Sequence, residues 1–163
     1  MKILNFADQL APRHPAKPSH LIRSLFILAF LASPLAYAEG IQTATVAFET
    51  EGLDLDTGAV TASDILEPPD GTDIRIAYNA LRSPRAVVMP GAAEGVELAF
   101  VSDVAFDGVT AASLEGLDFS SEPVDAPFSA GDTVVVRTAT GAVFKLGNAS
   151  ESGTRVTFNY ASL

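Results

Sequence analysis

One triplet in this sequence carries a residue type that could activate water. Asp56-Thr57-Gly58 lies in the run Leu53–Ala59, early in the part of the chain that follows residue 38. Two carboxylates a few Å apart cannot both ionise, so they share a proton and can act as acid and base. One chain carries one such triplet, so the second carboxylate would come from a second copy. Asp56 is therefore the candidate catalytic residue if the protein is an enzyme.

The triplet resembles the active-site triplet of aspartic peptidases, and Leu117-Asp118-Phe119 resembles the glycine-centred motif that follows it in that family. The resemblance implies a retropepsin-like homodimer that uses Asp56. Asp54 and Val60 depart from the family pattern, in which the residues before the catalytic Asp are apolar. The structural alternative is a strand that ends in a turn, with Asp at its start and Gly58 at positive φ. The sequence favours this alternative.

Calcium is a second possible use of the acidic residues between positions 54 and 73. The aspartates concerned are Asp54, Asp56, Asp64, Asp70 and Asp73. An EF-hand loop that began at Asp54 would need a ligand at position 58 and Glu at position 65, where Gly58 and Ile65 stand. We therefore predict no metal site, and a weaker, carbonyl-assisted cation site stays open.

The segment 1–38 reads as a cleaved secretory signal. Arg13, Lys17 and Arg23 precede the apolar run 25–32, and Ala36-Tyr37-Ala38 supplies the small residues of a cleavage site. The alternative is a membrane anchor, but the run is shorter than the roughly 18–20 residues that span a bilayer. The sequence has no cysteine for a lipid anchor. We expect a single domain over residues 39–163, periplasmic or extracellular.

Removal of this leader narrows the chemistry of the remaining chain. His14 and His20 both leave with it, so residues 39–163 contain no His and no Cys. A Ser-His-Asp triad, a Cys nucleophile and a His- or Cys-ligated zinc are excluded within one chain. The leader also holds four of the 10 basic residues and one of the 20 acidic ones, which leaves 6 against 19 and a net charge of −13. Such a polyanion repels phosphate backbones, so nucleic acid is not an expected partner.

Apolar residues alternate with polar ones along most of the chain, which is the period of half-buried strands. Examples are Ala44-Val46-Phe48, Ile74-Ile76-Tyr78 and Val96-Leu98-Phe100. We predict an all-β fold of about eight short antiparallel strands, a small sandwich or a partly open barrel.

The C-terminal third predicts a three-stranded meander over 133–138, 142–146 and 155–160, with 147–154 as a loop. Seven side chains should face inward: Val134, Val136, Phe144, Leu146, Val156, Phe158 and Tyr160. Arg137, Lys145 and Arg155 should point outward. One short helical turn is expected at 111–116, capped by Thr110.

A loop with two arginines follows the strand predicted at 74–78. Arg82 and Arg85 in Asn79–Arg85 could grip a ligand carboxylate through paired donors. The alternative is a charged connection without a ligand.

The order of these segments resembles the HmuY-like family of exported haem-carrier proteins. The likeness rests on Leu53–Val60, Thr72–Ile76, the hairpin Asp132–Leu146 and Val156–Tyr160. It implies an all-β exported fold with haem as a possible cofactor. The family's Trp is replaced by Thr72 here. Its axial ligands are His or Met, so Met89 is the one candidate ligand after residue 38.

These observations lead to one preferred function and one alternative. We expect an exported, soluble, non-enzymatic binding or interaction module without a membrane span or lipid anchor. The ligand-binding candidates are Met89, Arg82 and Arg85. The alternative is a dimeric aspartic peptidase that uses Asp56. The oligomeric state and the partner, a small molecule or a protein, stay open.

Overall fold

The fold is all-β, as predicted. The computed structural model describes residues 40–63, 67–81, 86–123, 128 and 131–163. The chain divides into two compact units, 1–33 and 34–163, and every described residue lies in the second. The described residues form nine strands and two short 3-10 helices, and none of them forms a helix long and apolar enough to cross a membrane.

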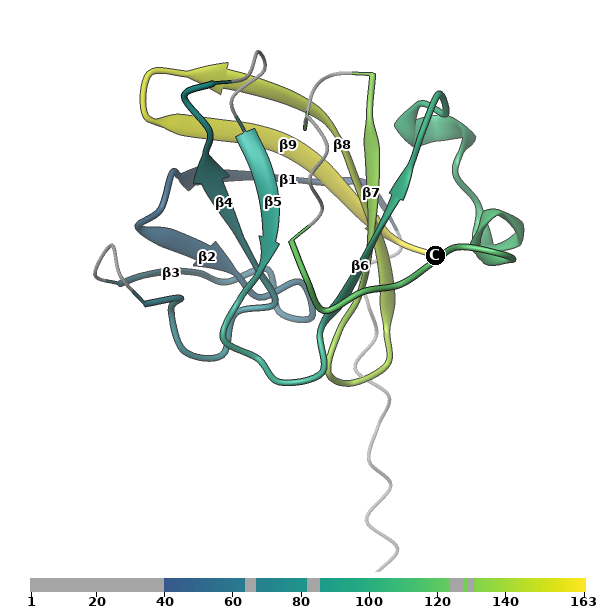
Figure 1. Ribbon diagram of the computed structural model, residues 1–163, viewed down its shortest axis with the longest axis horizontal. Coiled ribbons are helices and arrows are strands. Elements are labelled where there is room, and N and C mark those ends of the chain that lie inside the picture. Colours follow the sequence, from purple (N-terminus) through teal and green to yellow (C-terminus); the bar gives the residue numbers. More distant parts are fainter. Residues whose placement is uncertain (1–39, 64–66, 82–85, 124–127, 129–130) are drawn as a thin grey trace, which may run out of the picture. The chain divides into compact units, whose positions relative to one another are not determined.

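The strands form two antiparallel sheets (Figure 1). A five-stranded sheet has the order β1 (Gln42–Ala47), β9 (Arg155–Ser162), β8 (Val143–Ser152), β7 (Thr133–Arg137) and β6 (Glu97–Val101). A four-stranded sheet has the order β3 (Val60–Ala62), β2 (Glu51–Leu53), β4 (Ile74–Tyr78) and β5 (Ala86–Pro90). The sheets do not close into a barrel, which agrees with the sandwich or open barrel that the alternation predicted.

The core lies between the inner faces of the two sheets. All seven side chains predicted to face inward from the meander are buried. They pack against buried side chains of the four-stranded sheet and of β1, among them Val46, Leu53, Ile74 and Ile76. Branched and aromatic side chains at every second position suit a pleated, half-buried surface, which is why these segments form strands.

The segment predicted as the loop 147–154 is mostly strand. β8 continues to Ser152 and pairs with β9 beyond a register shift between Gly147 and Ser150. Asn148 has φ of 52° there, as expected where a bulge interrupts the ladder. The Gly, Asn and Ser composition marks this bulge and the tight turn at Gly153 rather than an open loop.

The outer face of β6, β7 and β8 is covered by residues 102–120, which we call the strap. It contains η1 (Phe106–Gly108), which we did not predict, and η2 (Ala111–Leu114) at the predicted helical turn. Thr110 begins η2, since its O accepts the N–H of Ser113 at 2.8 Å. The strap side chains Val104, Val109, Leu114, Leu117 and Phe119 pack in one apolar cluster with Val101 and Val135 of the sheet.

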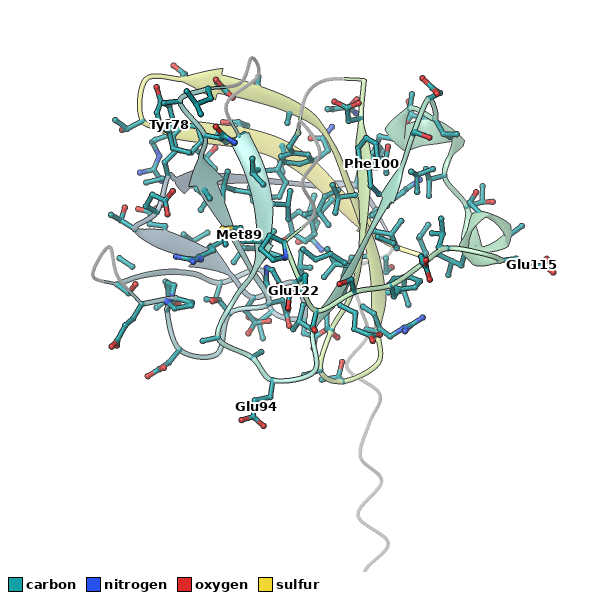
Figure 2. The ribbon with its side chains drawn as sticks, viewed as in Figure 1. Tyr78, Met89, Glu94, Phe100, Glu115 and Glu122 are labelled. Carbon is teal, nitrogen blue, oxygen red and sulfur yellow. The ribbon has the colours of Figure 1, made fainter. Side chains whose placement is uncertain are left out.

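Tyr78 does not lie on the inner face, contrary to the alternation in its strand. Its exposed fraction is 42%, and its ring meets the Phe48 ring edge-on with 5.3 Å between the centroids. Figure 2 labels Tyr78. The chain passes from one sheet to the other at Phe48–Thr50, where Glu49 has φ of 63°. The N–H of Tyr78 donates to Glu49 Oε1 at 2.7 Å, so this crossing takes the end of β4 out of the core.

Candidate functional site

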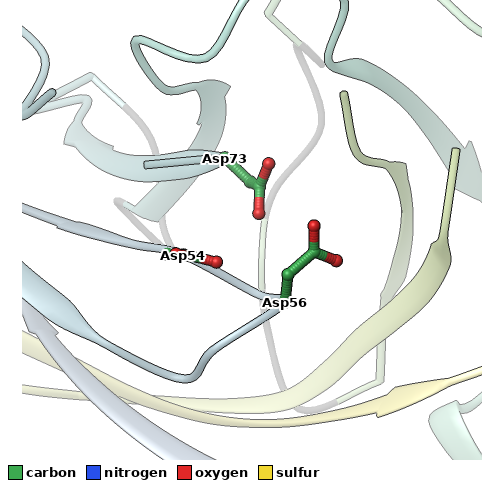
Figure 3. A group of neighbouring side chains, drawn as sticks. All are labelled: Asp54, Asp56 and Asp73. Carbon is green, nitrogen blue, oxygen red and sulfur yellow. The ribbon is translucent and has the colours of Figure 1, made fainter. Parts of the chain in front are cut away.

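Three carboxyl groups meet near the ends of β2 and β4. One oxygen from each of Asp54, Asp56 and Asp73 lies within 4.8 Å of the others. Figure 3 shows the carboxyl groups of Asp56 and Asp73 turned toward one another. We call these three residues the carboxylate cluster. They are three of the five aspartates that the sequence suggested for calcium.

The turn that carries two of them is built by Asp54. Its Oδ1 accepts the N–H of Thr57 at 3.0 Å, and its backbone O accepts the N–H of Gly58 at 2.8 Å. Gly58 has φ of 75°, as the structural alternative to a peptidase site predicted. The residue that starts the turn is Asp54 rather than Asp56, because Asp54 has the side chain that bonds back to the backbone.

Asp73 joins this turn to the four-stranded sheet from just before β4. It is 4% exposed, and its Oδ2 accepts the N–H of Leu55 at 2.8 Å. Its N–H donates to the O of Leu53, and its O accepts the N–H of Gly91 at 2.7 Å. Because Leu55 is buried in the core, the turn and Asp73 hold each other in place.

Asp56 points toward the opposite sheet and is bonded there. Thr140 donates to Oδ2 at 2.9 Å and Thr138 to Oδ1 at 3.4 Å, and the two threonine hydroxyls are 2.9 Å apart. Both threonines belong to the turn between β7 and β8, which the bond from the Gly141 N–H to the O of Thr138 closes. Neither threonine was predicted as a site residue, because their sequence signal is Thr-x-Thr before Gly141, a common turn composition.

Burial and neighbouring charge change the acidity of the cluster. Burial, and to a lesser extent the charges of Asp56 and Asp54, raise the pKa of Asp73 from 3.8 to about 6, although the N–H of Leu55 acts in the opposite direction. Burial and the charge of Asp54 also raise the pKa of Tyr160, whose hydroxyl donates to Gln42. Within the described residues no ion pair involves a cluster carboxylate.

The cluster can therefore hold a shared proton or present several oxygens together. Carboxylate and hydroxyl oxygens are hard ligands, of the kind that Ca²⁺ accepts. No imidazole or thiol stands among the described residues, so nucleophilic chemistry through those groups is absent from this part of the chain. Asp70 is not in the cluster, and Asp64 lies outside the described residues.

The other predicted ligand-binding residues do not join the cluster. Met89, labelled in Figure 2, lies half-buried in β5. In the strand register it pairs with Arg75 of β4. Arg82 and Arg85 lie outside the described residues. A separate cavity of about 290 Å³ is lined by residues of β3 and of the segment that follows it: Thr61, Ala62, Ser63, Glu67, Pro68, Pro69 and Asp70.

Comparisons with known proteins assign no family to the chain. No protein-family model matches it, and no curated protein matches it. Among solved structures, a candidate lipoprotein of Bacteroides fragilis is similar at a TM-score of 0.45 and 14% identity. The match covers 76% of this chain and 89% of that one.

Proposed function

We propose that this protein is an exported, non-enzymatic binding module. The observation that carries the proposal is the engagement of Asp56 by its own chain. Its carboxylate accepts hydroxyls of Thr138 and Thr140 and lies beside the carboxylates of Asp54 and Asp73. In a dimeric aspartic peptidase the same carboxylate would face the second copy. These contacts favour a structural role for Asp56, as a link between segments of its own chain. They do not favour Asp56 as one of the two carboxylates of a dimeric peptidase site.

The composition of residues 39–163 supports the same proposal. This segment has no His and no Cys, so it has neither the usual general base nor the most reactive nucleophile. The basic, apolar and Ala-x-Ala order of residues 1–38 supports the proposal of export. The first described strand begins at Gln42, so cleavage after Ala38 would remove no described element.

Haem is the ligand that the sequence resemblance implies, and Met89 is the residue to test for it. Its sulfur could supply one axial bond. Arg75 lies opposite Met89 in β4, and its guanidinium forms an ion pair with Glu49 at 3.9 Å. The described residues hold no second sulfur or imidazole for the opposite axial position. Among the described residues, Met89 would therefore supply the one axial bond to a haem.

Native mass spectrometry of the protein purified from its own source tests the main proposal. We expect a mass that begins at Glu39 and a retained small molecule, ion or partner chain. A retained leader would contradict export. A bare mass, combined with no partner recovered after cross-linking before lysis, would contradict a binding role.

Two further measurements distinguish the alternatives. Cleavage of unfolded protein at acid pH that is lost in Asp56→Asn but kept in Asp118→Asn would establish a peptidase and overturn the proposal. Haemin titration should give a Soret shift that changes in Met89→Leu. An unchanged haemin spectrum would exclude haem as the ligand. Native mass spectrometry would then remain the test of whether the protein binds another ligand or partner.

A further inference from the structure

The sequence contains two Asp-Gly pairs. One lies in an open turn and the other in a 3-10 helix. Asp70-Gly71 and Asp107-Gly108 are the only places where Asp precedes Gly. All four residues are exposed to solvent. A glycine after an aspartate has no side chain to shield its own backbone nitrogen. Where the backbone is free to rotate, this nitrogen can attack the carboxyl group of the aspartate and close a five-membered ring.

Asp70-Gly71 lies in an open turn. Gly71 has φ of 72°, and no heavy atom beyond its two neighbours in the chain lies within 4 Å of the place where its Cβ would be. No hydrogen bond of the Gly71 N–H is found within the described residues. The turn is held at its ends instead, since the N–H and the hydroxyl of Thr72 donate to the O of Pro69 at 3.3 and 2.6 Å.

Asp107-Gly108 is restrained inside η1. The N–H of Gly108 donates to the O of Ala105 at 2.8 Å, and a Cβ at Gly108 would lie 3.1 Å from Val104. Lys145 holds the same helix by donating to the O of Phe106 and of Val109. Helical backbone angles place the Asp107 carboxyl away from the following nitrogen, so closure there needs local unfolding.

We propose that Asp70 is a site of spontaneous isoaspartate formation in the folded protein and that Asp107 is protected. The backbone nitrogen of Gly71 attacks Cγ of the protonated Asp70 carboxyl. The carboxyl hydroxyl leaves with the amide proton as water, and a succinimide ring forms. Water then opens the ring at one of its two carbonyls, which restores aspartate or routes the backbone through Cγ as isoaspartate.

The modification would act on a turn that the fold depends on. Isoaspartate adds one methylene to the main chain between Pro69 and Thr72. Thr72 is fully buried, and Gly52 and Gly91 pack against it so closely that a Cβ at either would lie within 3 Å of its atoms. The longer turn cannot keep both bonds to Pro69 without moving Thr72. Thr72 precedes Asp73, so the change reaches the carboxylate cluster.

Ageing of the purified full chain at body temperature and mildly acidic pH tests the proposal. Peptide mapping with electron-transfer fragmentation distinguishes isoaspartate from aspartate at each position. We expect isoaspartate at residue 70 to exceed that at residue 107 by about tenfold or more, because only the second site needs local opening. Equal amounts at the two sites, or more at 107, would overturn the proposal.

Two asparagine variants allow positions 70 and 107 to be compared without the slow succinimide formation from aspartic acid. Asp70→Asn and Asp107→Asn close by the same attack with loss of ammonia, and deamidation is read as a mass change. Asp70→Asn should deamidate faster in the folded protein, and the two variants should react alike in concentrated guanidinium. If the difference persists in guanidinium, local sequence and not the fold sets it, and the proposal fails.

Discussion

The hydroxyl of Thr140 donates a 2.9 Å hydrogen bond to Asp56 Oδ2, although 84 residues separate them. This bond joins the turn after β2 in one sheet to the turn after β7 in the other. With the bond from Thr138 it ties the carboxylate cluster to the opposite side of the sandwich. The Asp-Thr-Gly triplet therefore serves as a connection between sheets, and several consequences can be measured.

Thr140→Val should destabilise the protein by about 1 kcal/mol, because it removes a hydrogen bond to a carboxylate at an exposed site. Urea unfolding gives the free energy of unfolding. Thr61→Val is the control, because it makes the same substitution at another exposed threonine, in β3. A Thr140→Val loss no larger than that of the control would mean that the bond to Asp56 contributes nothing.

The stability of the protein should fall as pH rises from about 4 to above 6. The pKa of Asp73 is about 6 in the folded state and near 3.8 when unfolded, so the folded state binds the proton more tightly. Protonation of Asp73 therefore stabilises the fold fully below about pH 4, and this contribution is lost as pH passes 6. At 1.36 kcal/mol per pH unit the whole effect is no more than about 3 kcal/mol.

Asp73→Asn should flatten that pH dependence and raise the free energy of unfolding near pH 8 by about 1–2 kcal/mol. The amide oxygen can still accept the N–H of Leu55, while the buried charge is gone. Asp118→Asn is the control, because Asp118 is exposed and outside the cluster. An unchanged slope between pH 4 and 6.5 in Asp73→Asn would assign the pH dependence to other groups.

Gly58→Ala should cost about 2 kcal/mol or more, because positive φ and a close contact act together. A Cβ at Gly58 would lie 2.9 Å from the Tyr160 hydroxyl. Gly141→Ala separates the two causes, since Gly141 has φ of 86° but open space around it, and should cost about 1 kcal/mol. Tyr160→Phe should recover part of the Gly58→Ala loss; if it recovers none, the contact is not the cause.

Lys145→Met should loosen the strap. The Nζ of Lys145 donates to the O of Phe106 at 3.0 Å and of Val109 at 2.8 Å, and two bonds from a charged donor contribute about 1–3 kcal/mol. Hydrogen exchange should rise across residues 102–120. Arg155→Met, at the uncovered end of the same sheet, should leave exchange in the strap unchanged. If the strap is equally protected from hydrogen exchange in both variants, its apolar contacts are sufficient to hold it on the sheet.

The alternation of side chains predicted most of the fold because it depends on neighbours in the sequence. Val134, Val136, Phe144 and Leu146 face the core as predicted. Alternation does not reveal which outer surfaces a distant segment covers, and it was wrong at Tyr78. The strap buries Val101 and Val135 on the outer face of the sheet, and the crossing at Phe48–Thr50 leaves Tyr78 exposed.

By itself the sequence determined the strand-rich class, the meander, the acidic composition, and the absence of His and Cys after residue 38. These properties depend on residue type and on local period. Only the tertiary structure decided that Asp73 lies beside Asp54 and Asp56, and that Thr138 and Thr140 bond to Asp56. Such contacts join residues far apart in the chain. Strand pairing of β2 with β4 brings Asp73 to Asp54, and the packing of one sheet on the other brings Thr138 and Thr140 to Asp56.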